Sequence, residues 1–191
     1  WVYEVELSNY EDIDKPFNVT TEKLDLYDRK WEEFVYTELF DVLKGKRVVK
    51  SKLVPGNTPF ITSTENNNGV TAYCKLPKMF KGNTITVNYD GSVGEAFYQP
   101  KPFYALDSVN VLYPKFELNI YIAMFLITLI RKEKHRYNYG RKWHKERMEK
   151  STIKLPVDEN GKPDWFFMEH FIKSLPYSKS IAEDDQLQLN I

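Results

Sequence analysis

A run of 13 residues without a single charge, LNIYIAMFLITLI from Leu118 to Ile130, constrains this chain more than any other feature. The run is shorter than the ~20 residues that a membrane-spanning helix needs. A cluster of cations follows it within residues 131–136, where positive charge stabilises the C-terminal end of a helix. We therefore expect one long buried helix near 117–136, roughly 30 Å in length, around which the domain packs.

Length and composition fit one ordinary domain. The 191 residues are enough to bury a sizeable core without metals or disulfides. Cys74 is the single cysteine and no signal peptide is evident, so a reducing cytoplasm is the expected compartment. Lysine plus arginine and aspartate plus glutamate both total 27, which removes any global basic argument for nucleic-acid binding. The cations are nevertheless concentrated in residues 131–150.

Strands and further helices are expected on both sides of the long helix. The clearest pattern is a hairpin in 82–106, where Asp90 and Gly91 interrupt an alternation of apolar and polar residues. The other expected elements are a strand, a helical turn and a stop at Gly45 within 31–47, strands at 60–63, 108–113 and 153–155, a short helix within 141–150, and a last helix at 165–174 with Asp164 as its N-cap.

Catalytic motifs are weak in this sequence. One cysteine and three widely spaced histidines do not make a zinc cluster, and no glycine-rich phosphate loop precedes a helix. We therefore expect no metal, nucleotide or S-adenosylmethionine site in this chain. The nearest approach to a nuclease centre is Asp90 with Glu95 and Lys101, whose spacing departs from the usual acid, x, lysine triplet. Enzyme activity is therefore a minority hypothesis, with a nuclease as its form.

Chemistry for binding is better represented. The basic region 131–150 interleaves cations with Tyr137, Tyr139 and Trp143, and these residue types neutralise phosphates and pack against sugars or bases. An alternative is a solvated surface on which the glutamates of the same region pair with neighbouring cations. Composition alone leaves both interpretations open.

Two polar segments add hydrogen-bonding side chains that phosphate contacts do not supply. They are Thr62 to Asn68 and Asn88 to Ser92, and such groups read base edges in a groove. Three consecutive asparagines in the first segment also have a simpler explanation, because asparagine tolerates left-handed backbone conformations.

Five stretches in this order resemble a known family. They are WEEFVYTELFDVLKGKR, GNTPFITSTENNNGV, GNTITVNYDGSVGEAFYQPKPFYAL, YNYGRKW and IKLPVDENGKPDWFFMEHFIKSLPYS. Together they resemble a target recognition domain of restriction-modification specificity subunits, of type I or related type II systems. The resemblance extends from Trp31 to about Ile181.

The resemblance implies a DNA-reading module without catalysis of its own, with a mixed α/β (α+β) fold in which a twisted mixed sheet packs against helices. Such domains place loops and strands against the major groove at one half of a split site. An adenine methyltransferase subunit or domain then flips and methylates the base, and S-adenosylmethionine is expected in that partner. A restriction subunit is a further partner in such systems.

The chain departs from the family in its extent. It has room for one recognition domain, expected at 31–181, and lacks a long heptad helix after it. Residues 1–30 are expected to be an extension or the end of a preceding region, and 182–191 a flexible tail. Either the chain is a piece of a larger subunit or it pairs with itself, in which case two-fold symmetry predicts a symmetric split site.

The residues that the sequence nominates for DNA contact lie in the polar and basic segments. They are Lys46, Thr62, Thr64, Asn67, Asn68, Asn88, Tyr89, Ser92, Tyr139, Arg141 and Lys142. The main rival hypothesis is a protein-interaction domain that docks a methyltransferase through its aromatic last helix without reading DNA.

Overall fold

The computed structural model describes residues 24–49, 51, 53–138, 140–176, 178 and 181. The predictions made for residues 1–23 and for the tail 182–191 lie outside the described residues. The strands are β1 (Trp31–Val35), β2 (Phe40–Lys44), β3 (Pro55–Ile61), β4 (Val70–Cys74), β5 (Thr84–Asn88), β6 (Ala96–Gln99), β7 (Tyr104–Ala105), β8 (Val109–Pro114) and β9 (Thr152–Pro156). The helices are α1 (Tyr36–Leu39), α2 (Ile120–Lys132), α3 (Lys145–Met148) and α4 (Trp165–Ser174), with 3₁₀ turns η3 (Asn67–Gly69) and η4 (Glu133–Arg136).

A four-stranded antiparallel sheet in the order β2-β8-β5-β6 forms the centre of the molecule. All five residues of β5 are buried, including Ile85 and Val87, because β5 lies between two neighbouring strands and is covered on both faces. This sheet therefore contributes a large share of the core.

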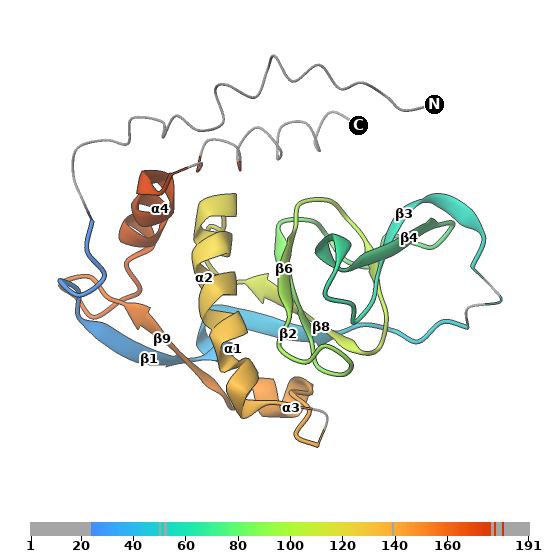
Figure 1. Ribbon diagram of the computed structural model, residues 1–191, viewed down its shortest axis with the longest axis horizontal. Coiled ribbons are helices and arrows are strands. Elements are labelled where there is room, and N and C mark those ends of the chain that lie inside the picture. Colours follow the sequence, from blue (N-terminus) through green and yellow to red (C-terminus); the bar gives the residue numbers. More distant parts are fainter. Residues whose placement is uncertain are drawn as a thin grey trace, which may run out of the picture.

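Helix α2 packs against β6 on one side and α4 on the other, and Figure 1 shows it standing between them. Asn119 begins the helix, since its side chain accepts a hydrogen bond from the backbone N–H of Ile122. The ring of Phe125 lies 6.2 Å from that of Trp31 on β1 and 5.9 Å from that of Phe171 on α4. The expected buried helix is confirmed as α2, although it is shorter than predicted, because it begins at Ile120 and its last turn, η4, is a 3₁₀ turn without buried residues. Helix α2 joins several elements into one core.

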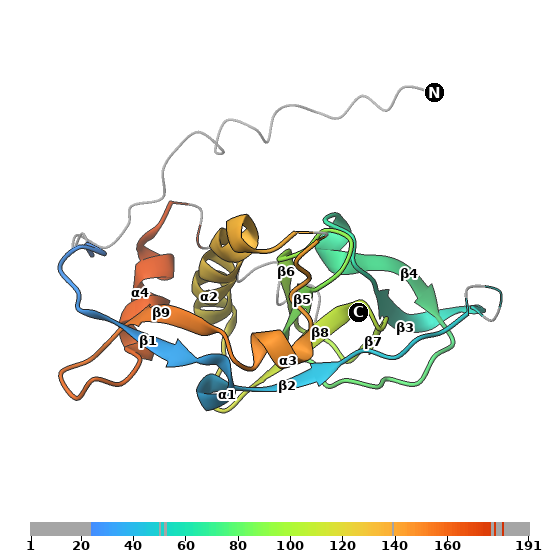
Figure 2. The same ribbon diagram turned by 90° about the horizontal axis from the view of Figure 1, so that it is seen from below.

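Two smaller sheets flank the centre. Strands β1 and β9 pair antiparallel beneath α2, while β4-β3-β7 form a three-stranded sheet at the opposite end of the molecule (Figure 1). In the latter, β3 runs antiparallel to β4 and parallel to β7, with a register shift in the β3–β4 pair. Figure 2 shows α3 lying along β2, so the chain after α2 returns to the central sheet.

The observed elements match the mixed α/β fold class, although the strands divide among three sheets. The hairpin in 82–106, the N-cap Asp164 and the strand at 153–155 are confirmed, and the Asp164 carboxylate accepts from Phe167 N at 2.9 Å. The helical turn near Leu39 is also present, as is a short helix within 141–150. None of the helices in the described part of the chain combines the length and hydropathy of a membrane span.

Leu126 is fully buried in the centre of α2, so replacing it with alanine leaves a cavity in the core. We expect Leu126→Ala to lower the free energy of unfolding by about 2–5 kcal/mol in urea denaturation. Leu43→Ala is the matched control, because Leu43 is 39% exposed and its truncation should cost less than about 0.5 kcal/mol. Equal losses for the two variants would contradict the central role of α2.

Candidate nucleic-acid interface

The turn between β5 and β6, residues 89–95, is the point at which several separate segments meet. Its backbone closes through hydrogen bonds from Asn88 N to Glu95 O and from Gly94 N to Asn88 O, both 2.8 Å. Gly91 and Gly94 have φ angles of 70° and 82°, which side chains with a Cβ rarely adopt. A Cβ on Gly94 would also lie 2.8 Å from Lys134 Cγ, so the turn sits directly against the end of α2 and η4.

The polar loop 62–69 is fastened to this turn. Asn88 donates from Nδ2 to the carbonyl oxygen of Thr64 at 2.9 Å, and Asn68 donates to the carbonyl oxygen of Tyr98 at 2.8 Å. Asn67 and Asn68 both have φ angles near the left-handed region, at 50° and 54°. The left-handed explanation for the asparagines is therefore confirmed for the backbone, while the Asn67 side chain is exposed at the loop surface.

The segment that leads from η4 to α3 lies on the other side of the turn. Lys142 Nζ contacts Asp90 Oδ2 at 2.6 Å, and this hydrogen bond holds the pKa of Asp90 below its usual value. The carbonyl oxygen of Lys142 in turn accepts a hydrogen bond from Arg147. Asp90 and Lys142, which are 52 positions apart in sequence, are therefore joined by a charge-assisted hydrogen bond.

Glu95 ties the same turn to the C-terminal end of α2. Its carboxylate pairs with Arg131 Nε at 3.1 Å and with Lys134, and the Arg131 guanidinium lies 5.0 Å from the centroid of the Phe97 ring. Asp90 and Glu95 thus both bind cations of the basic region. In the fold, both acids act as turn and hydrogen-bonding residues.

The end of β2 completes the group of segments. Lys44 Nζ lies 5.0 Å from the centroid of the Tyr89 ring, and a hydrogen bond with Tyr89 raises the pKa of Lys44. Lys46 lies two residues further along the chain, and its backbone N–H donates a hydrogen bond of 2.9 Å to the carbonyl oxygen of Ala105. Its exposed side chain makes no ion pair within the described part of the chain.

The nominated residues differ in how much of their side chains they present. Lys46, Asn67, Asn68 and Arg141 are exposed, whereas Thr62, Thr64, Tyr89, Ser92 and Lys142 are half-buried. Asn88 is fully buried, so in this structure its amide positions loop 62–69 instead of facing solvent. Tyr139 lies outside the described residues. We call the surface formed by loop 62–69, turn 89–95 and the described residues of segment 137–147 the recognition surface.

A second concentration of cations, which was not predicted, lies earlier in the chain. Residues 42–89 contain eight lysines or arginines and one acid, Glu65. Among them, Lys75, Lys78 and Lys81 are exposed near the three-stranded sheet and make no ion pair among the residues that the structure describes. Tyr73 on β4 is 59% exposed beside them. Counting charges in a moving window, instead of seeking the densest run, would have found this region.

Comparison with known proteins assigns the family. The model for the type I restriction modification DNA specificity domain matches residues 28–183, and the chain belongs to this family. This confirms the resemblance and the expectation of a non-catalytic specificity module, and it does not favour the protein-interaction or nuclease alternatives. Within the described residues, no cluster of three histidine, cysteine, aspartate or glutamate side chains is placed to hold a metal ion.

One similar protein is the type II restriction enzyme BgcI specificity subunit S.BcgI of Heyndrickxia coagulans, 36% identical over 149 residues. The match covers 77% of this chain and 44% of that subunit, so the chain spans less than half of its length. Among solved structures, the type I restriction-modification S subunit from M. genitalium aligns with a TM-score of 0.58 at 14% identity, covering 86% of this chain and 42% of the other. The HsdS subunit from Thermoanaerobacter tengcongensis aligns with a TM-score of 0.57 at 14% identity, covering 88% and 40%. Both structures share the fold of this chain.

The Asp90–Lys142 pair generates a pH-dependent prediction. Because the folded pKa of Asp90 is lowered, its ionised form stabilises the fold above the unfolded pKa of about 3.9, and this contribution is lost as the pH falls through the folded value. The Asp90 side chain is 35% exposed, so Asp90→Asn should lower the free energy of unfolding at pH 7 by at most about 1 kcal/mol.

Urea denaturation at pH 7 and at pH 3 measures the effect. The difference between Asp90→Asn and wild type should narrow at pH 3. Glu117→Gln is the control, because Glu117 is exposed and makes no ion pair with any residue that the structure describes. A difference of unchanged size at pH 3 would rule out the ion pair as its cause.

Proposed function

We propose that this chain is the target recognition domain that reads one half of a split site in double-stranded DNA. The observation that carries the proposal is the convergence of loop 62–69, turn 89–95 and segment 137–147 on one surface, where polar side chains adjoin cations. Phosphate contacts position a protein on DNA and base-edge contacts give specificity, and the recognition surface offers both kinds of group. Membership of a DNA specificity domain family supports the same function.

The proposed roles of the individual residues follow from how far their side chains are exposed. Asn67, Ser92 and Thr64 supply short hydrogen-bonding side chains at loop positions, whereas Lys46 and Arg141 supply charge at the edges. Asn88 and Asn68 position the loops that carry these groups, because their side-chain amides donate hydrogen bonds to backbone carbonyls. The bases are therefore read by a surface whose shape is held in place by the hydrogen bonds of these two amides.

The proposed partner is an adenine methyltransferase subunit or domain, which carries S-adenosylmethionine and performs the chemistry, while this chain contributes no cofactor. A restriction subunit is a further proposed partner. The recognition domain is proposed to occupy residues 31–181, and the second half of the site is read by another domain of the same protein or by a second copy of the chain. The solved relatives include a structure described as showing complex assembly of a type I restriction-modification system, which supports an assembled form.

Selection from a pool of random duplexes, with the full-length protein and its methyltransferase, tests the proposal. We expect one split sequence to be enriched, and sequencing of methylated bases in source DNA, with and without this chain, should reveal the same motif. Equal binding of all duplexes at matched salt would contradict the function.

A second measurement concerns base preference. Asn67→Gly removes the side chain while keeping a residue that accepts a positive φ, so the loop should persist. We expect discrimination at one base pair to fall by about 1–3 kcal/mol in competition binding. Asn160→Gly is the matched control, because Asn160 is an exposed turn asparagine beyond β9. If Asn67→Gly keeps the base preference of the wild type, the Asn67 side chain does not contact a base.

A further inference from the structure

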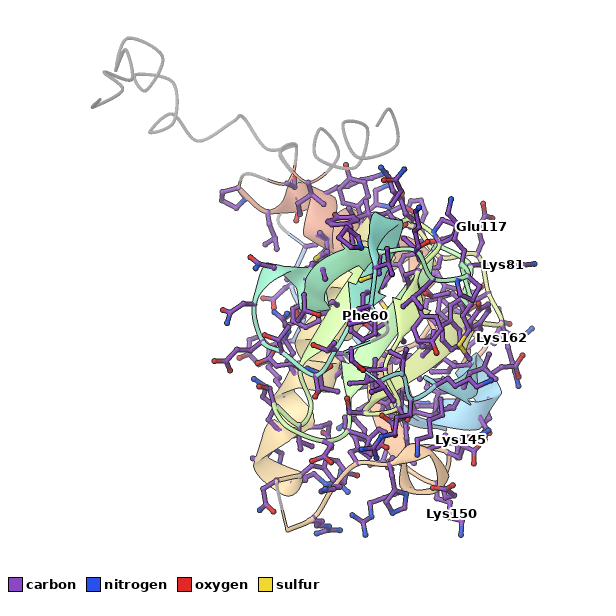
Figure 3. The ribbon with its side chains drawn as sticks, turned by 90° about the vertical axis from the view of Figure 1, so that its right-hand side faces the viewer. Phe60, Lys81, Glu117, Lys145, Lys150 and Lys162 are labelled. Carbon is purple, nitrogen blue, oxygen red and sulfur yellow. The ribbon has the colours of Figure 1, made fainter. Side chains whose placement is uncertain are left out.

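A hollow of about 410 Å³ lies between η4, α3 and the start of β9. This volume falls within the range of about 300–1,000 Å³ typical of small-ligand sites. Its lining combines four cations, one acid and hydroxyl groups, and consists of Arg136, Tyr137, Arg141, His144, Glu146, Arg147, Lys150, Ser151 and Thr152. In Figure 3, Lys145 and Lys150 lie together at one end of the molecule, away from Lys81 and Glu117.

The floor of the hollow is a rigid buried unit. The rings of Tyr137 and Trp143 stack with centroids 4.4 Å apart and planes 7° from parallel. The Ser151 hydroxyl oxygen lies 3.0 Å from the Tyr137 hydroxyl and accepts from Trp143 Nε1 at 3.1 Å. The same hydroxyl donates to the carbonyl oxygen of Arg147 at 2.8 Å. Because these groups are buried and bonded to one another, the floor presents a defined shape before any ligand arrives.

The cations around this floor are held at set positions. The guanidinium groups of Arg136 and Arg141 lie 5.9 and 5.8 Å from the centroid of the Tyr137 ring. Arg147 is fixed by its hydrogen bond to the carbonyl oxygen of Lys142. Lys150 is exposed and makes no ion pair among the residues that the structure describes. The fork of an arginine side chain matches two oxygens of one phosphate group.

Local acids neutralise only part of this charge. Arg136 pairs with Glu133 at 2.7 Å, and Glu146, the one acid that lines the hollow, has a side chain that is 73% exposed and lies 2.8 Å from His144 Nδ1. The remaining positive charge attracts an anion, since like charges held close together repel unless a counterion joins them. A hollow lined by arginines and hydroxyls suits a tetrahedral oxyanion such as a phosphate.

The geometry points to this hollow as an anchor for one phosphodiester of the DNA backbone, and the inference rests on the proposed function. Arg147 bonds to the Lys142 carbonyl, and Lys142 Nζ bonds to Asp90 in turn 89–95. A phosphate held in the hollow is thereby connected through two hydrogen bonds to the turn that faces the bases. The anchor sets the register of turn 89–95 on the duplex, because a phosphate contact positions the protein without reading sequence.

Neutral-phosphate scanning of the selected duplex tests the anchor. In each duplex of the series, one phosphate is replaced by an uncharged methylphosphonate, and the affinity of the full-length protein is measured. We expect one position per half site to weaken wild-type binding about ten-fold, as the loss of a charge-assisted hydrogen bond does. In Lys150→Gln the penalty at that position should shrink, while penalties elsewhere remain.

A salt titration gives an independent readout. The plot of log affinity against log salt has a negative slope, and Lys150→Gln and Arg136→Gln should each make that slope shallower by about 0.9. The ratio of the affinity for the target to the affinity for random duplex should stay unchanged. Lys162→Gln is the matched control, because Lys162 is exposed in the turn that follows β9 and does not line the hollow. The control should keep the wild-type slope and all wild-type penalties.

The outcomes separate the anchor from the proposed function. If wild type prefers its target but Lys150→Gln and Arg136→Gln leave every methylphosphonate penalty and the slope unchanged, the anchor is overturned and DNA recognition stands. If wild type shows no duplex preference, the proposed function falls and the anchor with it. Competition with inorganic phosphate at millimolar concentration shows whether the hollow holds a DNA phosphodiester or a free phosphate ion. Weak competition at matched ionic strength supports a DNA phosphodiester, and release of the duplex in wild type and Lys150→Gln alike overturns it.

Discussion

The burial of helix α2 against three neighbouring elements is the constraint on which the rest of the structure depends. Its apolar residues contact β6, α4 and the β1–β9 pair, so a single helix closes a core that two sheets share. Without that burial, the cations at its C-terminal end would have no fixed position. Because Arg131 and Lys134 lie at that end, core packing also places the charges that hold turn 89–95.

Turn 89–95 illustrates how acids organise a basic surface. Asp90 and Glu95 each bind cations that belong to other segments, and these pairs orient lysine and arginine stems rather than cancelling the surface charge altogether. Partly exposed pairs of this kind contribute little to stability. These ion pairs matter for the positions of the segments, since they connect the end of α2, the turn and segment 137–147 into one recognition surface.

Sequence patterns anticipated much of this arrangement. The length of the apolar run and the cations after it located α2, and alternation located β5 and β6, because these periodicities reflect burial on one element. The candidate residues lie in polar turns that interrupt these periodic runs, and the fold brings several of those turns together. Their individual roles were harder to assign. Asn68 and Asn88 read in sequence as contact residues, whereas in the fold their amides bond to backbone carbonyls of Tyr98 and Thr64.

The sequence by itself determined the buried helix, the main hairpin, the family resemblance and the basic character of residues 131–150, because each depends on residues near one another in the chain. Only the tertiary structure decided which distant segments meet. The pairing of Asp90 with Lys142 and the pairing of Glu95 with Arg131 both depend on packing between elements far apart in sequence. No local periodicity encodes such contacts, because the order of strands in a sheet and the crossing of a helix over it arise only when the whole core closes.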